Sequence, residues 1–452
     1  ACGVSLGTLD RLAERWSRSR TVLSFYCMGL GQSTVGTWKN NSLINLHLLT
    51  GQIGNVGAGP FSLTGQPNAM GGRECGLLCH QLPGYRFVED PRHRTQVEHY
   101  WGRPIGTISP RPGLSAVEMF QALDRGTLKA IWIAATNPVV SLPDLNCVKA
   151  GLGRAELVVV SDAYHPTETT RVADVVLPAA SWGEKESTST NSERMVSRSP
   201  KMWDPPGEAL PDWEVLCRFA ERMGFGDAFP YASGSDAWDE FVRLTKSRPC
   251  DMAGVTSSRL NDGASLQWPC PDQLHYGTKR RYLDQTFPTP DGKAVFLPRD
   301  HRDPFEPTDD DFPFVLTTGR VYAHWHTLTR TGKVSKLLAR DPAPYVEMAF
   351  EDADRLAIAD GDLVRLSTRR GQVLLAARRE VGVRPGTVFV PFHWGDLFGE
   401  GNALNHLTVP AFGPVEKQPE LKFCAVNVTP VGVGPDLRSV QTCTLQSLPV
   451  LD

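Results

Sequence analysis

The chain has 452 residues, a formal net charge of −3 and 41% hydrophobic residues, a composition typical of a folded globular protein. This length exceeds what one hydrophobic core organises and predicts two or three domains. The small net charge gives no general attraction to nucleic acid, and no apolar run approaches the roughly 18 residues that a membrane helix needs. We therefore expect neither a nucleic-acid partner nor a membrane segment.

The ten cysteines are scattered along the chain and include no Cys-x-x-Cys pair. A zinc ribbon, or an iron–sulfur cluster held by this chain alone, is therefore not expected. Only Cys75 and Cys79 lie close together, a spacing typical of two buried thiols one helical turn apart.

The first half of the chain alternates between expected helices and strands. Apolar residues at helical spacing predict helices over residues 7–19, 41–49, 116–123 and 212–223. Short apolar runs predict strands over residues 21–26, 129–134, 157–160 and 174–177. This alternation indicates an α/β fold with doubly wound parallel sheets. Residues 54–76 are rich in Gly, Pro, Asn and Gln, so we expect an irregular segment that suits a functional site.

The texture changes after residues 247–312, which are dense in Pro, Asp and Gly. Short strands are predicted over residues 314–317, 363–368, 373–377, 387–391 and 423–428. Arg370-Gly371 indicates a hairpin turn, and the whole predicts a mostly β, barrel-like domain. The predicted domains are residues 1–75, an α/β domain incomplete at its N-terminus; 76–250, a second α/β domain; 251–311, a connecting region; and 312–452, the barrel.

The densest polar segment is Thr64–Glu74. Its glycines allow backbone to approach a ligand closely, and Gln66 can both donate and accept hydrogen bonds. Arg73 offers a planar fork of donors that suits a small oxyanion. The alternative interpretation is a Gly-rich surface loop with a solvated arginine.

A second constellation, Thr317–Thr327, follows a predicted strand and gathers donors around Gly319. Hydroxyls, Arg320 and backbone N–H groups suit a phosphate or a polar heterocycle. His324 and His326 also allow a metal, and ordinary hydrogen-bonded histidines in a barrel turn are the alternative.

A third constellation, Ser161-Asp162, ends a predicted strand. Its carboxylate can accept two hydrogen bonds from a guanine edge, and a helix N-cap is the equally open alternative. Charged residues at Lys185, Asp212 and Lys422 could reach a phosphate or line a strand end, or be solvated surface charges.

Taken in order, these segments resemble the C-terminal two-thirds of the molybdenum bis(guanine dinucleotide) oxidoreductases, and within them the assimilatory and periplasmic nitrate reductases. The resemblance spans residues from about 20 to 430. Its motifs are Met28-Gly29 with Gln32, His47–Gly51, Thr64–Glu74, Ser161-Asp162, Glu184–Glu186 with Thr190–Arg194, Thr318–Thr327 and Lys417–Lys422.

The resemblance implies a molybdopterin-dinucleotide-binding barrel and two pterin guanine dinucleotides around one molybdenum. Met28, Gln66 and Arg73 match positions near the metal and the substrate, as catalytic residues. The implied cofactor-binding residues are Gln32, Asn137, Ser161, Asp162, Lys185, Asp212, Thr318, Gly319, Arg320, His324, His326, Thr327, Asn402 and Lys422. Phe392 or His393 matches the lining of the substrate funnel. No side chain of this chain is expected to ligate the metal.

The implied reaction is the reduction of nitrate to nitrite by a cytoplasmic enzyme of nitrate assimilation. Its electron donor would be ferredoxin, flavodoxin or an NADH-dependent reductase subunit. The family's 4Fe-4S motif and metal-ligating cysteine are expected upstream of residue 1, so this chain alone is expected to be inactive. The sequence departs from the family pattern at Gly31, Ser187 and Gly413, which weakens the local cofactor assignments.

Two alternatives remain open. One is a formate dehydrogenase of the same superfamily, although Arg73 stands where those enzymes commonly carry an acidic residue. The other is a folded fragment that binds the cofactor without performing redox chemistry.

Overall fold

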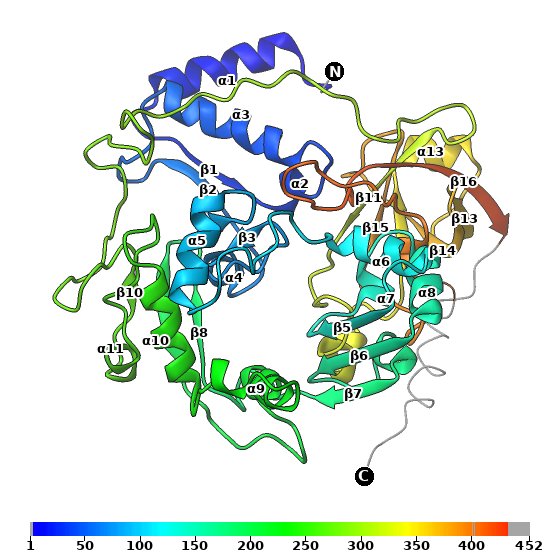
Figure 1. Ribbon diagram of the computed structural model, residues 1–452. Helices are drawn as coiled ribbons and strands as arrows, with labels where there is room; N and C mark the ends of the chain where they lie inside the picture. Colours follow the sequence, from blue (N-terminus) through cyan, green and yellow to red (C-terminus); the bar gives the residue numbers. More distant parts are fainter. Residues whose placement is uncertain (1–2, 400, 402, 433–452) are drawn as a thin grey trace. The chain divides into compact units, whose positions relative to one another are not determined.

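The computed structural model describes residues 3–399, 401 and 403–432 (Figure 1). The chain divides into two compact units, each assembled from separate segments of sequence. The first unit comprises Ala1–Gly31, Thr37–Ser115 and Ala180–Asp300. The second unit comprises Gln32–Gly36, Ala116–Ala179 and His301–Asp452.

The first unit joins a helical layer to small sheets. Its helices are α1 (Leu6–Arg18), α2 (Met28–Gly31), α3 (Gly36–Leu49), α4 (Ala69–Glu74), α5 (Pro91–Tyr100), α9 (Asp212–Arg222), the 3-10 helix η2 (Gly226–Ala228), α10 (Gly234–Leu244) and α11 (Ser257–Asn261). Its strands are β1 (Leu23–Tyr26), β2 (Gly59–Ser62), β3 (Gln81–Leu82), β4 (Arg86–Phe87), β8 (Ser187–Thr190), β9 (Met195–Ser199) and β10 (Leu266–Gln267). Strands β1 and β2 pair in parallel, and β8, β9 and β10 form an antiparallel sheet.

The expectation of an irregular segment over residues 54–76 was partly wrong. This segment contains β2, which pairs with β1, and the short helix α4. Both elements were missed because glycine and proline have low helix and strand propensities. Tertiary contacts, which these propensities do not include, stabilise the two elements. The helix predicted over residues 41–49 begins earlier, at Gly36.

A buried core lies among α10, α11 and the β8–β9–β10 sheet. Its buried members include Val196, Val242, Met252, Leu266 and Trp268. The first part of the predicted connecting region, 251–311, therefore contributes to a folded core.

The second unit begins with the alternation of helices and strands that is typical of α/β proteins. Its elements there are α6 (Ala116–Asp124), β5 (Ala130–Ala134), α7 (Pro138–Ser141), α8 (Leu145–Arg154), β6 (Leu157–Asp162), the 3-10 helix η1 (Thr170–Val172) and β7 (Val175–Pro178). The strands pair in parallel in the order β5-β6-β7, as predicted. Their isoleucine and valine side chains pack with α6 and α8 into one apolar cluster, because strands covered by helices must be apolar.

The rest of the second unit is a closed six-stranded barrel, which confirms the predicted fold class (Figure 1). Its elements are β11 (Phe314–Gly319), η3 (Thr331–Lys333), α12 (Ser335–Leu338), β12 (Tyr345–Met348), α13 (Phe350–Arg355), β13 (Leu363–Ser367), β14 (Gln372–Arg379), β15 (Thr387–Pro391), η4 (Leu404–His406) and β16 (Cys424–Gly432). The strand order is β11-β15-β12-β14-β13-β16. The predicted hairpin at Arg370-Gly371 is confirmed by the antiparallel β13–β14 pair, whereas β12 was missed.

No helix in the described part of the chain is both long and apolar enough to cross a bilayer.

Candidate functional site

The parallel strands of the second unit end at one edge and place polar residues there. Ala134 of β5 pairs with Ser161 of β6, and Asp162 pairs with Pro178 of β7. Ligands of open α/β sheets bind at this edge, outside the carboxyl ends of the strands. Ser161 is buried, and its hydroxyl accepts a 2.7 Å hydrogen bond from the indole of Trp132.

Asn137, just beyond β5, is the centre of a buried network. Its amide nitrogen donates to Glu168 Oε2 at 2.8 Å and to the Thr327 hydroxyl at 3.2 Å. Its Oδ1 accepts from the backbone N–H and the hydroxyl of Thr169, at 3.2 and 2.6 Å. The side chain of Asn137 thus joins the sheet to the segment that follows β11. Sequence reasoning missed Glu168, whose buried carboxylate also accepts from the backbone N–H of Leu397.

Asp162 ends β6 and shapes the turn that follows. Its Oδ1 accepts the backbone N–H of Tyr164 at 2.9 Å, so the alternative of a helix N-cap is wrong. The ring of Tyr164 lies 5.7 Å from the Arg330 guanidinium and 5.9 Å from the Lys333 ammonium. Cationic side chains therefore gather beside the turn that Asp162 begins.

A second group of predicted residues lies around the end of β11. The Thr318 hydroxyl donates to Leu421 O at 2.8 Å, and Lys422 Nζ donates to Thr318 O at 2.6 Å. The backbone N–H of Leu421 donates in turn to Gln32 O. Gln32, Thr318 and Lys422 are thus linked, and exposed Arg320 follows one residue beyond β11.

Gly319, predicted to bind cofactor, has a packing role. A Cβ there would lie 2.5 Å from the Phe389 ring on β15, so only glycine fits without movement. This packing contact explains why glycine stands at position 319, and the explanation does not require a bound ligand.

Histidines pack beneath this end of the barrel. His393 is fully buried; its Nδ1–H donates to His326 O at 2.7 Å, and its Nε2 accepts the backbone N–H of Val321 at 3.0 Å. Burial, with smaller contributions from His324, Arg320 and His326, lowers the pKa of His393 to about 4, so the ring is neutral near pH 7. With both nitrogens engaged, His393 is not suited to line a funnel.

The two histidines of the 317–327 segment differ in their surroundings. His324 is buried and its nitrogens contact the Thr331 hydroxyl and Asp341 O, which leaves none for a metal. His326 Nε2 lies 3.4 Å from Arg320, and burial followed by Arg320 and Arg330 lowers its pKa. Within the described residues, His, Cys, Asp and Glu side chains form no group of three or more that could hold a metal ion.

In the first unit, the predicted substrate loop ends in α4. Gln66 and Arg73 are exposed, and Met28 begins α2. Arg73 Nε donates to Ala69 O at 3.3 Å within α4, and its two terminal nitrogens make no hydrogen bond to described residues. Such an arginine can offer its fork to an anion.

The neighbouring residue, Glu74, was not singled out from the sequence. Its carboxylate is 1% exposed and accepts from the Thr190 hydroxyl at 2.8 Å and from the Trp268 indole at 2.5 Å. Burial raises the pKa of Glu74, although the two hydrogen bonds and Arg73 oppose this. Its partners lie more than 100 residues away in sequence, so no local pattern indicates them.

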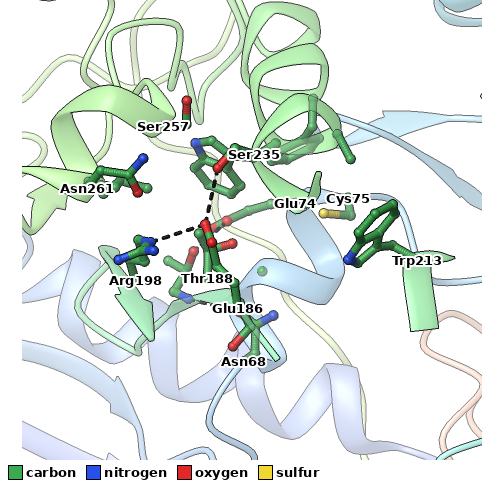
Figure 2. Close-up of a pocket in the computed structure, with 18 residues that line it drawn as sticks. Asn68, Glu74, Cys75, Glu186, Thr188, Arg198, Trp213, Ser235, Ser257 and Asn261 are labelled. Carbon is green, nitrogen blue, oxygen red and sulfur yellow. Dashed lines mark hydrogen bonds and ion pairs between the residues drawn. The ribbon is translucent and has the colours of Figure 1, made fainter. Parts of the chain in front are cut away.

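A cavity of about 260 Å³ adjoins α4 in the first unit (Figure 2). Asn68, Glu74 and Trp213 line it, and Glu186 there bonds to Arg198 and Ser235, each at 3.1 Å. None of the predicted cofactor residues lines this cavity. Lys185 and Asp212, both predicted, form an ion pair in the same unit. Asn402 lies outside the described residues.

The second-unit residues fit a pterin dinucleotide in their chemistry. Arg320 and Lys422 are cations that suit phosphates, and Asp162 supplies a carboxylate that suits a guanine edge. Asp162 lies at the carboxyl end of β6, the edge that open α/β sheets use for ligands, and Arg320 directly follows the barrel strand β11.

Comparisons with known proteins agree with this arrangement. Residues 5–222 match the family model "Molybdopterin oxidoreductase", and residues 314–425 match "Molydopterin dinucleotide binding domain", together well over half of the chain. The chain is 49% identical over 434 residues to a nitrate reductase of Synechocystis sp., covering 95% of this chain and 61% of that protein. It is 39% identical over 428 residues to the alpha subunit of an F420-dependent formate dehydrogenase of Methanocaldococcus jannaschii, covering 94% and 61%.

Among solved structures, the acetylene hydratase of Pelobacter acetylenicus shares the fold. The TM-score is 0.54 at 19% identity, over 74% of this chain and 49% of that one. The chain thus spans about three-fifths of the length of the two relatives above. On these matches and on its closed barrel, the chain belongs to the molybdopterin oxidoreductase family.

Proposed function

We propose that the protein reduces nitrate to nitrite, with molybdenum held by molybdopterin guanine dinucleotides. The observation that carries this proposal is Arg73: an exposed guanidinium whose terminal nitrogens make no hydrogen bond to the described residues, in a chain 49% identical to a nitrate reductase. Nitrate is a planar monoanion, and the planar fork of arginine matches it.

Most of the residues that would hold the cofactor belong to the second unit, and Lys185 and Asp212 of the first unit are further candidates. Arg320 and Lys422 would bind its phosphates, and Asp162 would accept hydrogen bonds from guanine. The buried network of Asn137 would keep the strand ends and the 320–327 segment in register. When bound, the cofactor supplies the two-electron oxygen-atom transfer that no side chain can perform.

The chain's own share in the reaction is placement and electrostatics. Arg73 would attract and orient nitrate, and Gln66 on the same loop would offer a neutral hydrogen bond. No side chain has to act as a nucleophile. The neutral His393 would brace the turn behind Arg320 without adding charge.

We further propose that this is a cytoplasmic enzyme of nitrate assimilation. A 4Fe-4S cluster outside this chain would pass electrons from ferredoxin, flavodoxin or an NADH-dependent subunit. The likeness of the chain to nitrate reductases supports the reaction more directly than it supports the compartment or the donor.

The test is nitrite formation by the complete protein, produced from its natural coding sequence and loaded with cofactor. We expect viologen-dependent turnover of nitrate that exceeds any turnover of formate. Formate oxidation without nitrate reduction would instead establish the rival function, which the 39% identity to a formate dehydrogenase subunit favours.

A further inference from the structure

We propose that Glu74 is a positioning residue that, together with Thr190, fixes the direction of Arg73. This inference rests on the proposed function, because it gives Arg73 the task of placing the anion. It concerns a buried contact made by the residue that directly follows the exposed arginine on α4.

Thr190, the last residue of β8, contacts both ends of α4. Its backbone N–H donates to Asn68 Oδ1 at 2.9 Å, just before the helix begins. Its hydroxyl donates to Glu74 Oε2 at 2.8 Å, at the last residue of the helix. One residue of the sheet therefore sets both the position and the tilt of a six-residue helix.

We call the contacts of Thr190 with Asn68 and Glu74 the α4 clamp, and two further contacts make this clamp rigid. Glu74 Oε1 accepts from the Trp268 indole, and Glu74 O accepts the backbone N–H of Gly84 at 2.7 Å. Thr190 and Trp268 are themselves 3% and 5% exposed, so water cannot replace these bonds cheaply.

The helix needs such support, because its own sequence is a poor helix former. It contains Gly71 and Gly72, and its N-cap residue Asn68 makes no capping bond to it. A Cβ at Gly71 would lie 2.1 Å from Asn68 Oδ1, so the glycine admits the Asn68 side chain that reaches Thr190. In the part of the chain that the structure describes, the Arg73 side chain hydrogen-bonds to Ala69 O of the same helix alone, so its direction follows that of α4.

The clamp is tested on the complete, cofactor-loaded protein with Thr190→Val, which removes the hydroxyl but keeps the shape. Hydrogen exchange of the α4 amides of Gly72 and Cys75 should accelerate about 5- to 10-fold. Thr190→Ser should restore slow exchange. Thr188→Val, the same change two residues earlier on β8, is the matched control, because among the described residues the Thr188 hydroxyl makes no hydrogen bond to α4, although it lines the same cavity; it should leave exchange as in the wild type.

Steady-state kinetics then link the clamp to the anion. In Thr190→Val, KM for nitrate should rise about 5-fold while kcat stays within about twofold, and Thr190→Ser should recover the original KM. Unchanged exchange, or an unchanged KM despite faster exchange, overturns the inference. If the wild type oxidises formate and ignores nitrate, the proposed function fails, and the same KM comparison with formate decides the role of Glu74. If the wild type turns over neither nitrate nor formate, the hydrogen-exchange result alone decides whether Glu74 and Thr190 hold α4 in place.

Discussion

The side-chain amide of Asn137 and the hydroxyl of Thr327 are joined by a 3.2 Å hydrogen bond across 190 residues of sequence. This bond ties the end of a parallel strand to the segment that leaves the first barrel strand. It brings Asn137 and Thr327, both predicted to bind the cofactor, into one buried network.

Replacing Asn137 with leucine should lower the free energy of unfolding of the second unit by about 3 kcal/mol, because the buried Glu168 carboxylate and the Thr169 donors lose their partner. Urea denaturation measures this loss. Thr327→Val, which removes a single bond, should cost only about 1 kcal/mol. Equal losses in the two variants would contradict the network.

Glu306 should be a much stronger anchor than its neighbour Asp309. Glu306 bonds to both terminal nitrogens of Arg370, at 2.8 and 2.7 Å, and both side chains are largely buried. Although burial alone would raise the pKa of Glu306, Arg370 and Arg369 hold it below its ordinary value. Its stabilisation is therefore present at neutral pH and is lost as the pH falls below the ordinary glutamate range.

Glu306→Gln should cost about 3 kcal/mol at pH 7, since it leaves a buried guanidinium without its counter-charge. Asp309→Asn, which weakens a more exposed pair with Arg369, should cost clearly less than Glu306→Gln. Thermal or urea unfolding at pH 7 compares the two, and a larger effect of the Asp309 variant would refute this assignment.

His393 should make the second unit sensitive to acid. In the folded state the pKa of His393 is about 4, below the ordinary histidine value of 6.5. At pH values between these two, the folded state therefore binds fewer protons than the unfolded state. Stability should fall by about 2 kcal/mol from this group between pH 7.5 and pH 5. The protection factor of the Val321 amide, which donates to His393, should fall in parallel once the rate is corrected for the pH dependence of intrinsic exchange.

His393→Gln provides the comparison, because glutamine can accept from Val321 and donate to His326 without titrating. The variant should lose this part of the pH dependence. A profile identical to that of the wild type would show that His393 does not titrate on unfolding.

Arg73→Gln should lower kcat/KM for nitrate about 100-fold, because a charge-assisted contact to the anion is lost. Arg73→Lys keeps the charge but loses the planar fork, so we expect a loss of about 10-fold. Arg92→Gln, an exposed arginine paired with Asp90 outside the loop, is the control and should leave kinetics unchanged. Wild-type kinetics in Arg73→Gln would exclude Arg73 from the site.

The elements that sequence predicted well are those with their own apolar signal. The valine and isoleucine strands of β5 and β6 and the hairpin at Arg370-Gly371 are confirmed within one or two residues. Strand β8 was missed because its four residues are Ser and Thr, without apolar alternation. Strand β12 was missed because it has only four residues and a helix begins two residues after its end.

The site divides in the same way. The candidate residues at strand ends, such as Asp162 and Arg320, were proposed from their positions relative to predicted strands, and the structure places both directly at strand ends. Glu74 and Thr190 could not be proposed from the sequence, because their role depends on a contact between segments that lie 116 residues apart. The packing role of Gly319 likewise depends on a ring from another strand.

The order of strands in the barrel has a consequence for biosynthesis. The first strand, β11, pairs with the last, β16, which also flanks β13. During translation the wall therefore stays open until residues near 432 have emerged from the ribosome, and both edges remain available to other chains. A nascent chain arrested before β16 would be a substrate for chaperones rather than a folded domain.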